Sequence, residues 1–218
     1  MSDWWSYRLS DFLLFSPRTW YRLIELYNRD LWPAQLLWVG LGLAVLLQLR
    51  REGERGARLI WAGVAVAWIS VGFGFHWRRY SEINWAATWF ALAFAVQSGG
   101  LLWSGVYRRR LRFGDVRSAR GRAGLGLLAF AIVLMPIIDP VLGRGWIHSA
   151  VFGVMPDPTA VATLGLLLVT ERPGWLLAPI PLLWCLVSGA TLLALGSPEA
   201  WIPPLAGLLA VVLLVRRR

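Results

Sequence analysis

Long uncharged apolar runs, separated by clusters of arginine, constrain this chain more than any motif does. A helix needs about 20 mostly apolar residues to cross the hydrocarbon core of a bilayer. The runs are continuous and lack the alternation that indicates strands. The sequence therefore predicts an all-α, polytopic membrane helix bundle with about seven transmembrane segments: Leu31–Leu49, Leu59–Phe75, Asn84–Tyr107, Ala123–Leu142, Val151–Thr170, Gly174–Leu195 and Ala200–Val215.

The composition supports a membrane protein and argues against a soluble or secreted one. Hydrophobic residues make up 57% of the 218 residues and charged residues only 16%, which is more apolar than a soluble domain. The net charge is +10, all of the basic residues are arginines, and the single cysteine excludes an intrachain disulfide. Because the arginines sit in the loops between apolar runs, we attribute the charge to membrane orientation and expect a lipid partner, with no nucleic acid.

The fifth segment is broken at Pro156-Asp157-Pro158, because each proline removes a hydrogen-bond donor from a helix. Either it crosses as a broken segment or it re-enters as a half-helix. With a crossing, 15 arginines lie on one side and 7 on the other, whereas re-entry gives 11 on each side. The positive-inside rule favours the crossing, with the N-terminus outside and the C-terminus in the cytoplasm. The basic loop Arg108–Arg122 would then face anionic lipids of the cytoplasmic leaflet.

Residues 1–30 are predicted to form a separate amphipathic interfacial segment ahead of the transmembrane domain, residues 31–218. Ser16 is a good N-cap and Pro17 a good first helical residue. The helix that follows places its charged residues on one face and its apolar residues on the other, which predicts a helix lying flat, apolar side toward the membrane. It would serve as a passive anchor or as a cover over the outer mouth of the bundle.

Unusual polar residues gather at the outer ends of the predicted segments. An ionisable group at this depth is expensive and usually faces a partner, water or a ligand. Asp157 before Pro158 is typical of an N-cap, and a half-helix beginning there would also direct its N–H groups at a bound solute or ion. The candidate binding residues are Asp157, Thr159, Thr163, Asp139, His148, His76, Glu82 and Asn84, with both threonines lining the same cavity as Asp157.

Recognisable catalytic signatures are missing, so we expect a non-enzymatic protein without a bound cofactor. The sequence has no Walker A loop, no HExxH, no CxxC and no GxSxG. The two histidines, His76 and His148, leave one alternative open: both would lie near the outer face and could hold a haem iron or a divalent metal.

Three stretches together resemble a bacterial family of small multi-pass membrane proteins classed as a domain of unknown function. They are the segment from Ser16-Pro17-Arg18 to Tyr27-Asn28, the segment Glu82-Ile83-Asn84-Trp85-Ala86-Ala87, and the segment from Pro156-Asp157-Pro158 to Leu164-Gly165. The resemblance implies a location in the bacterial inner membrane and carries no established activity.

Three functions follow as hypotheses. The first is a small-solute or ion transporter, or a channel-like protein, with its polar site at the outer end of the bundle. The second is an accessory or assembly subunit that packs in a larger membrane complex or forms a homo-oligomer. The third is a haem- or metal-binding membrane redox protein.

Overall fold

The computed structural model describes residues 14–49, 53–172 and 174–215, and that part of the chain is almost entirely helical. Three helices continue without interruption into π-helical segments: α3 into η3 (Val71–Trp77), α4 into η5 (Leu102–Tyr107) and α5 into η6 (Phe130–Leu134). The α-helices are α1 (Pro17–Leu31), α2 (Ala34–Gln48), α3 (Glu54–Ser70), α4 (Ala87–Leu101), α5 (Ala119–Ala129), α6 (Met135–Val141), α7 (Pro156–Val169), α8 (Pro179–Ala194) and α9 (Ile202–Val215).

Five helical stretches in the described residues are long and apolar enough to cross a membrane: Glu54–Glu82, Ala87–Tyr107, Ala119–Val141, Trp175–Ala194 and Pro198–Val215. Helices α1 and α2 qualify only as one pair, bent by 86°. Helix α7 has 14 residues, which gives about 20 Å at 1.5 Å per residue. The architecture is consistent with a helical membrane bundle, and the count of seven crossings stays a prediction.

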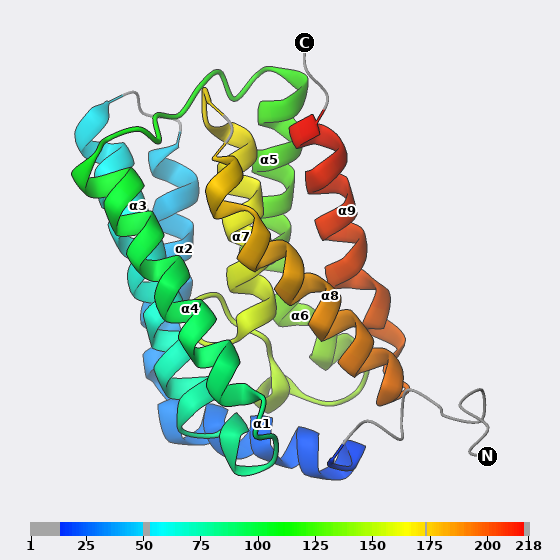
Figure 1. The fold of residues 1–218 in the computed structure, drawn as a ribbon. Helices are drawn as coiled ribbons and strands as arrows, with labels where there is room; N and C mark the ends of the chain where they lie inside the picture. Colours follow the sequence, from blue (N-terminus) through cyan, green and yellow to red (C-terminus); the bar gives the residue numbers. More distant parts are fainter. Residues whose placement is uncertain (1–13, 50–52, 173, 216–218) are drawn as a thin grey trace, which may run out of the picture.

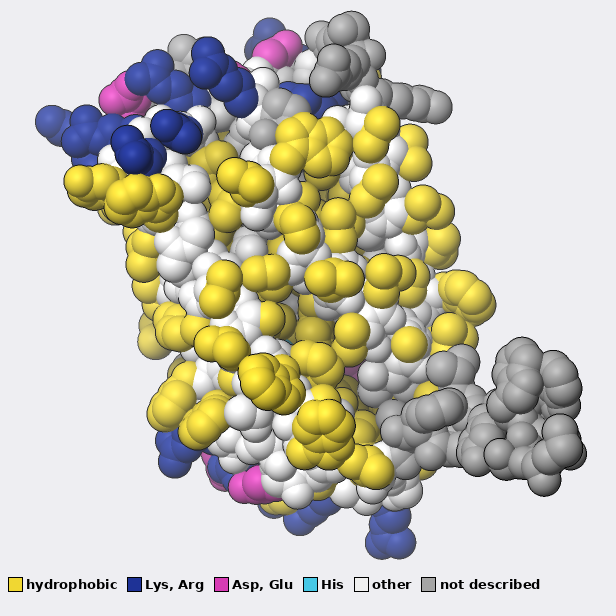
Figure 2. All heavy atoms as spheres, viewed as in Figure 1, with side chains coloured by type: hydrophobic (Ala, Val, Ile, Leu, Met, Phe, Trp, Pro, Cys, Tyr) yellow, Lys and Arg dark blue, Asp and Glu magenta, His cyan; other side chains and the backbone are white. Residues whose placement is uncertain are grey.

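The long helices run side by side in alternating directions, and α7 lies in the middle of them (Figure 1). Every residue of α7 except Asp157 is buried. The face of the bundle seen in Figure 2 is covered with apolar side chains along its length, while arginines and acids gather at its two ends. A bundle with a buried centre and an apolar flank is the arrangement expected where lipid replaces water around the helices.

Helices α5 and α7 pack with their backbones in contact. A Cβ atom on Gly124 of α5 would lie 2.6 Å from the carbonyl oxygen of Gly165, and one on Gly165 of α7 would lie 2.7 Å from the carbonyl oxygen of Gly124. Only glycine fits at either position, because backbone atoms cannot give way as a flexible side chain does. This pair of glycines fixes the depth at which α7 sits in the bundle.

Helix α1 begins as predicted, with Pro17 as its first residue and the Ser16 hydroxyl accepting a hydrogen bond from the Thr19 N–H at 3.2 Å. The sequence assigned its apolar face to the membrane surface, but the structure packs that face on protein. Trp20 and Tyr27 are buried, and their rings contact Phe75 of η3 with centroids 6.0 and 5.5 Å apart. Helix α1 therefore covers one end of the bundle (Figure 1) and shares its core.

The stretch before α7 also differs from the prediction. No helix precedes the proline pair: residues 151–154 form a turn in which Gly153 has φ +75°, and α7 begins at Pro156 with Met155 as its N-cap. Asp157 is the second helical residue and therefore not the N-cap. The N-cap interpretation of Asp157 is wrong because Pro156, not Pro158, occupies the first helical position, which suits a residue without an N–H.

Candidate functional site

A small, partly open cavity lies under α1, where the N-terminal end of α7 meets the end of α6 and the start of α9. Its volume is about 60 Å³, which is room for a few water molecules. Three residues of α1 form one side of it: Trp20, Tyr21 and Ile24. Its polar lining comprises three of the predicted site residues and one further acid: Asp139, His148, Asp157 and Glu199.

Asp157 enters this cavity from the first turn of α7. Its Oδ1 accepts a hydrogen bond from the Trp184 Nε1–H at 2.7 Å. Within the described ranges, no arginine lies close enough to Asp157 to form an ion pair. The N-terminal end of α7 offers roughly half a positive charge, which offsets a carboxylate only in part. Asp157 thus has hydrogen-bond support but no counter-charge from a side chain.

Arg144, in the loop after α6, holds the other two acids. Its Nε donates to Asp139 Oδ1 at 2.6 Å, and its second guanidinium nitrogen pairs with Glu199 of η9 (Pro198–Trp201). The guanidinium also stacks over the Tyr21 ring, 4.9 Å from its centroid. Burial by itself would lower the pKa of Arg144, but the hydrogen bond from its guanidinium to Asp139 and the nearby acidic charges raise that pKa overall. Arg144 is therefore a permanent cation between two carboxylates.

Pro140 follows Asp139 in the sequence, a pattern that predicts a helix boundary at Asp139. The structure carries α6 on to Val141, so Pro140 lies within the helix and Asp139 in its last turn. The short α6 directs the Asp139 carboxylate back toward Arg144, five residues later in the chain.

His148 lies at the end of the 3-10 turn η7 (Trp146–His148). Its Nδ1 is 2.6 Å from the carbonyl oxygen of Arg144. Because a carbonyl oxygen only accepts, Nδ1 carries the proton, and in the neutral ring Nε2 is an acceptor. His148 therefore adds a hydrogen-bonding ring to the cavity lining.

Direct hydrogen bonds fasten α1 over the cavity. The Tyr21 hydroxyl bonds to the Ser197 hydroxyl at 2.8 Å. The Asn28 side-chain amide donates to the carbonyl oxygens of Ile147 and Ser149 at 2.8 and 3.2 Å. The sequence left two roles open for this helix, a passive membrane anchor and a cover over the end of the bundle. These contacts match the role of a cover.

Thr159 and Thr163 do not line the cavity. Both are fully buried, and each hydroxyl donates to the carbonyl oxygen four residues earlier in α7. The Thr159 hydroxyl also accepts from the Gly153 N–H, and the Thr163 hydroxyl accepts from the Trp68 Nε1–H. The two threonines hold α7 against the preceding turn and against α3.

His76 lies apart from the cavity, in η3. Its side chain is completely buried, and neither ring nitrogen has a hydrogen-bond partner among the residues that the structure describes. Aromatic rings surround it, with centroids 4.5 Å away for Phe94 and 4.7 Å for Trp184. The structure therefore does not place the two histidines around a shared space, and the described residues hold no group of three or more His, Cys, Asp or Glu side chains suited to a metal ion.

Glu82 and Asn84 also lie outside the cavity. Glu82 is exposed, at the end of the 3-10 turn η4 (Tyr80–Glu82). The Asn84 side-chain amide donates to the Tyr80 hydroxyl at 2.9 Å, and its oxygen accepts from the Ala86 N–H. Asn84 thus shapes the turn before α4.

Sequence reasoning missed Glu199 as a site residue. It directly precedes the last apolar run, which places it at the same end of the predicted bundle as Asp139 and His148. That shared end is the sequence signal that could have identified it. Its pairing with Arg144 depends on the distance between the ends of α6 and α9, which no local pattern reveals. The Glu199 Oε2 atom is buried and has no hydrogen-bond partner in the described part of the chain.

Comparisons with known proteins place the chain in a family without giving it an activity. No curated protein and no solved structure matches it. A family model described as "Family of unknown function (DUF6064)" matches residues 18–218. That match covers α1 from its second residue, every element that lines the cavity and all five long apolar helices. The chain therefore belongs to the DUF6064 family of unknown function.

Proposed function

We propose that this protein transports a small solute or ion across a membrane, most simply a cation, and binds it at Asp157. The observation that carries the proposal is a carboxylate at the start of a central buried helix, facing a cavity, without a basic partner among the described residues. An unpaired carboxylate inside a bilayer is costly and therefore usually holds a cation or a proton, or faces water.

The charges around the cavity favour a cation over an anion. Asp139, Asp157 and Glu199 face one guanidinium, that of Arg144. The cavity is too small for a drug-sized molecule. A proton or a small inorganic cation with a few waters fits both its size and its charge.

The orientation belongs to the same proposal. The loops at the end opposite α1 carry most of the arginines, so we infer that this end is cytoplasmic and that the Asp157 cavity opens to the outer face. A bacterial inner membrane agrees with the family resemblance described above. The Arg108–Arg122 loop would then contact anionic lipids on the cytoplasmic side.

Flux measurements on Asp157→Asn test the proposal. The purified protein is reconstituted into liposomes, and proton, Na⁺ and K⁺ fluxes are recorded with enclosed indicator dyes. We expect the wild-type protein to carry at least one of these ions. The flux of that ion through Asp157→Asn should be lower by a factor of about ten or more, because an amide supplies no negative charge.

Asp115→Asn is the matched control, because Asp115 is exposed in the loop before α5 and does not line the cavity. It should leave flux unchanged. The proposal fails if wild-type liposomes leak no faster than empty ones for all three ions, or if Asp157→Asn keeps full flux.

A further inference from the structure

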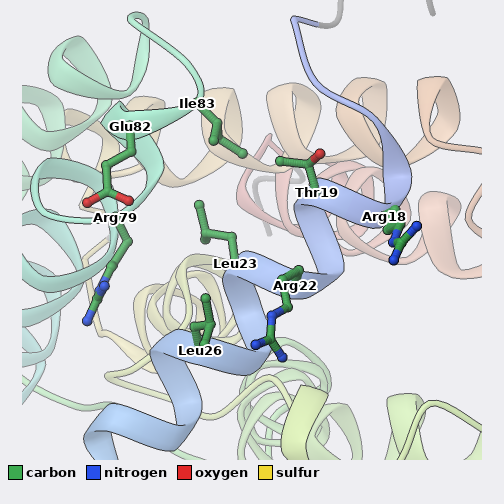
Figure 3. A pocket seen from close by; sticks show the side chains of 8 residues that line it. All are labelled: Arg18, Thr19, Arg22, Leu23, Leu26, Arg79, Glu82 and Ile83. Carbon is green, nitrogen blue, oxygen red and sulfur yellow. The ribbon is translucent and has the colours of Figure 1, made fainter.

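A second hollow lies on the opposite, charged side of α1, between that helix and the turn around η4. We call it the α1 groove. Its volume is about 350 Å³, and it is lined by Arg18, Thr19, Arg22, Leu23, Leu26, Arg79, Glu82 and Ile83. Figure 3 shows Leu23, Leu26 and Ile83 in the middle, with Arg18 and Arg22 of α1 on one side and Arg79 and Glu82 on the other. The groove shares no lining residue with the Asp157 cavity.

The charge of the α1 groove is positive, because three guanidinium groups line it against one carboxylate. Arg22 pairs with Glu25 at 2.8 Å and Arg79 pairs with Asp30. Arg18 forms no ion pair within residues 14–49, 53–172 and 174–215. A groove of this charge attracts an anion, and planar guanidinium groups match the geometry of phosphate oxygens.

The middle of the α1 groove is apolar. Leu26 keeps 37% of its surface exposed there. A simple inorganic anion would gain nothing from these aliphatic side chains, whereas an amphiphile would place carbon atoms against them. The groove therefore matches a molecule that carries a phosphate and an apolar portion next to it.

Two exposed tryptophans flank the turn that forms one side of the groove. Trp77 and Trp85, before and after η4, are 53% and 70% exposed. Exposed tryptophan at the end of an apolar helix is typical of the lipid headgroup level. With these tryptophans at the headgroup level of a bilayer, the arginines of the α1 groove would lie at the depth of the phospholipid phosphates.

We propose that the α1 groove is a binding site for an anionic phospholipid, with the phosphate held by Arg18 and Arg22 and the glycerol and upper acyl carbons against Leu26 and Ile83. This site is independent of transport and lies at the end of the bundle opposite the Arg108–Arg122 loop. It would fasten α1, the cover of the Asp157 cavity, to the surrounding leaflet.

Photo-crosslinking with a located readout tests this. The full chain is placed in phosphatidylcholine nanodiscs with increasing amounts of photoactivatable phosphatidylglycerol, and labelled peptides are mapped by mass spectrometry. In wild-type protein we expect labelling on α1 and residues 77–85. In Arg18→Gln/Arg22→Gln the half-labelling concentration there should rise roughly 30-fold, because each arginine contributes about 1 kcal/mol and 1.4 kcal/mol is tenfold.

The matched control is Arg29→Gln/Arg55→Gln, which also removes two exposed arginines but none from the groove. It should label as wild type does, and thermal unfolding confirms that both double variants fold. Leu26→Ser should weaken labelling without any change of charge. Equal labelling in both double variants, or equal competition by phosphatidylcholine, would overturn the proposal. So would displacement by glycerol 3-phosphate as effective as by the intact lipid, since that shows a soluble-anion site.

Discussion

Gly124→Val should remove most of the folded protein. The new Cβ would lie 2.6 Å from the carbonyl oxygen of Gly165 and 2.9 Å from the Cβ of Leu168, and neither atom can move without shifting α7. Overpacking against backbone forces α5 and α7 apart, and we expect a loss of about 3 kcal/mol or more in the free energy of unfolding. The measurement is thermal unfolding of the purified protein in detergent, together with its monodisperse yield from size-exclusion chromatography.

Gly126→Val, two residues further along α5, is the matched control. A Cβ on Gly126 meets nothing within 4 Å, so this variant has the same change in side-chain volume and helix propensity without the collision. We expect it to unfold near the wild-type temperature. If Gly124→Val were as stable as Gly126→Val, the close approach of α5 and α7 would be incorrect.

The helices themselves are largely predictable because the length of an apolar run and its flanking caps are local properties. Ser16 and Pro17 start α1 where the sequence indicates. The role of α1 is not local: an amphipathic helix has the same pattern whether its apolar face meets lipid or protein. Only the packing of Trp20 and Tyr27 on Phe75 distinguishes the two.

The candidate site is predictable only as far as topology brings chain segments to one end. Asp139, His148 and Asp157 follow or precede helices that end on the same side, and the structure places all three around one cavity. Thr159 and Thr163 share the helix of Asp157, but their hydroxyls bond to the backbone of α7, a choice that the sequence leaves open. Prolines at both 156 and 158 leave the start of α7 ambiguous in the sequence. The helix begins two residues earlier than predicted, so Asp157 lines the cavity as expected but is not the N-cap.

Arg144→Ala should destabilise the α1 end of the bundle, because one guanidinium holds two carboxylates that are only 14% exposed. Removing it leaves Asp139 and Glu199 close together without a cation. Breaking a buried pair by deleting one partner typically costs 3–5 kcal/mol, and since this network is partly open to solvent we expect about 3 kcal/mol. Thermal unfolding measures the loss, and protease cleavage within α1 should become faster, because Arg144 also stacks on Tyr21.

Two further variants show whether Arg144→Ala destabilises the protein by leaving Asp139 and Glu199 without a cation or by removing the contact with Tyr21. In the triple variant Asp139→Asn/Arg144→Ala/Glu199→Gln no acid is left without a partner, so it should recover much of the stability that Arg144→Ala loses. Arg29→Ala removes an arginine from an exposed pair with Glu25 and should cost under about 0.5 kcal/mol. If the triple variant were no more stable than Arg144→Ala, the loss of stability would come from the missing contact between Arg144 and Tyr21. Arg144 would then stabilise α1 by packing and not by its charge.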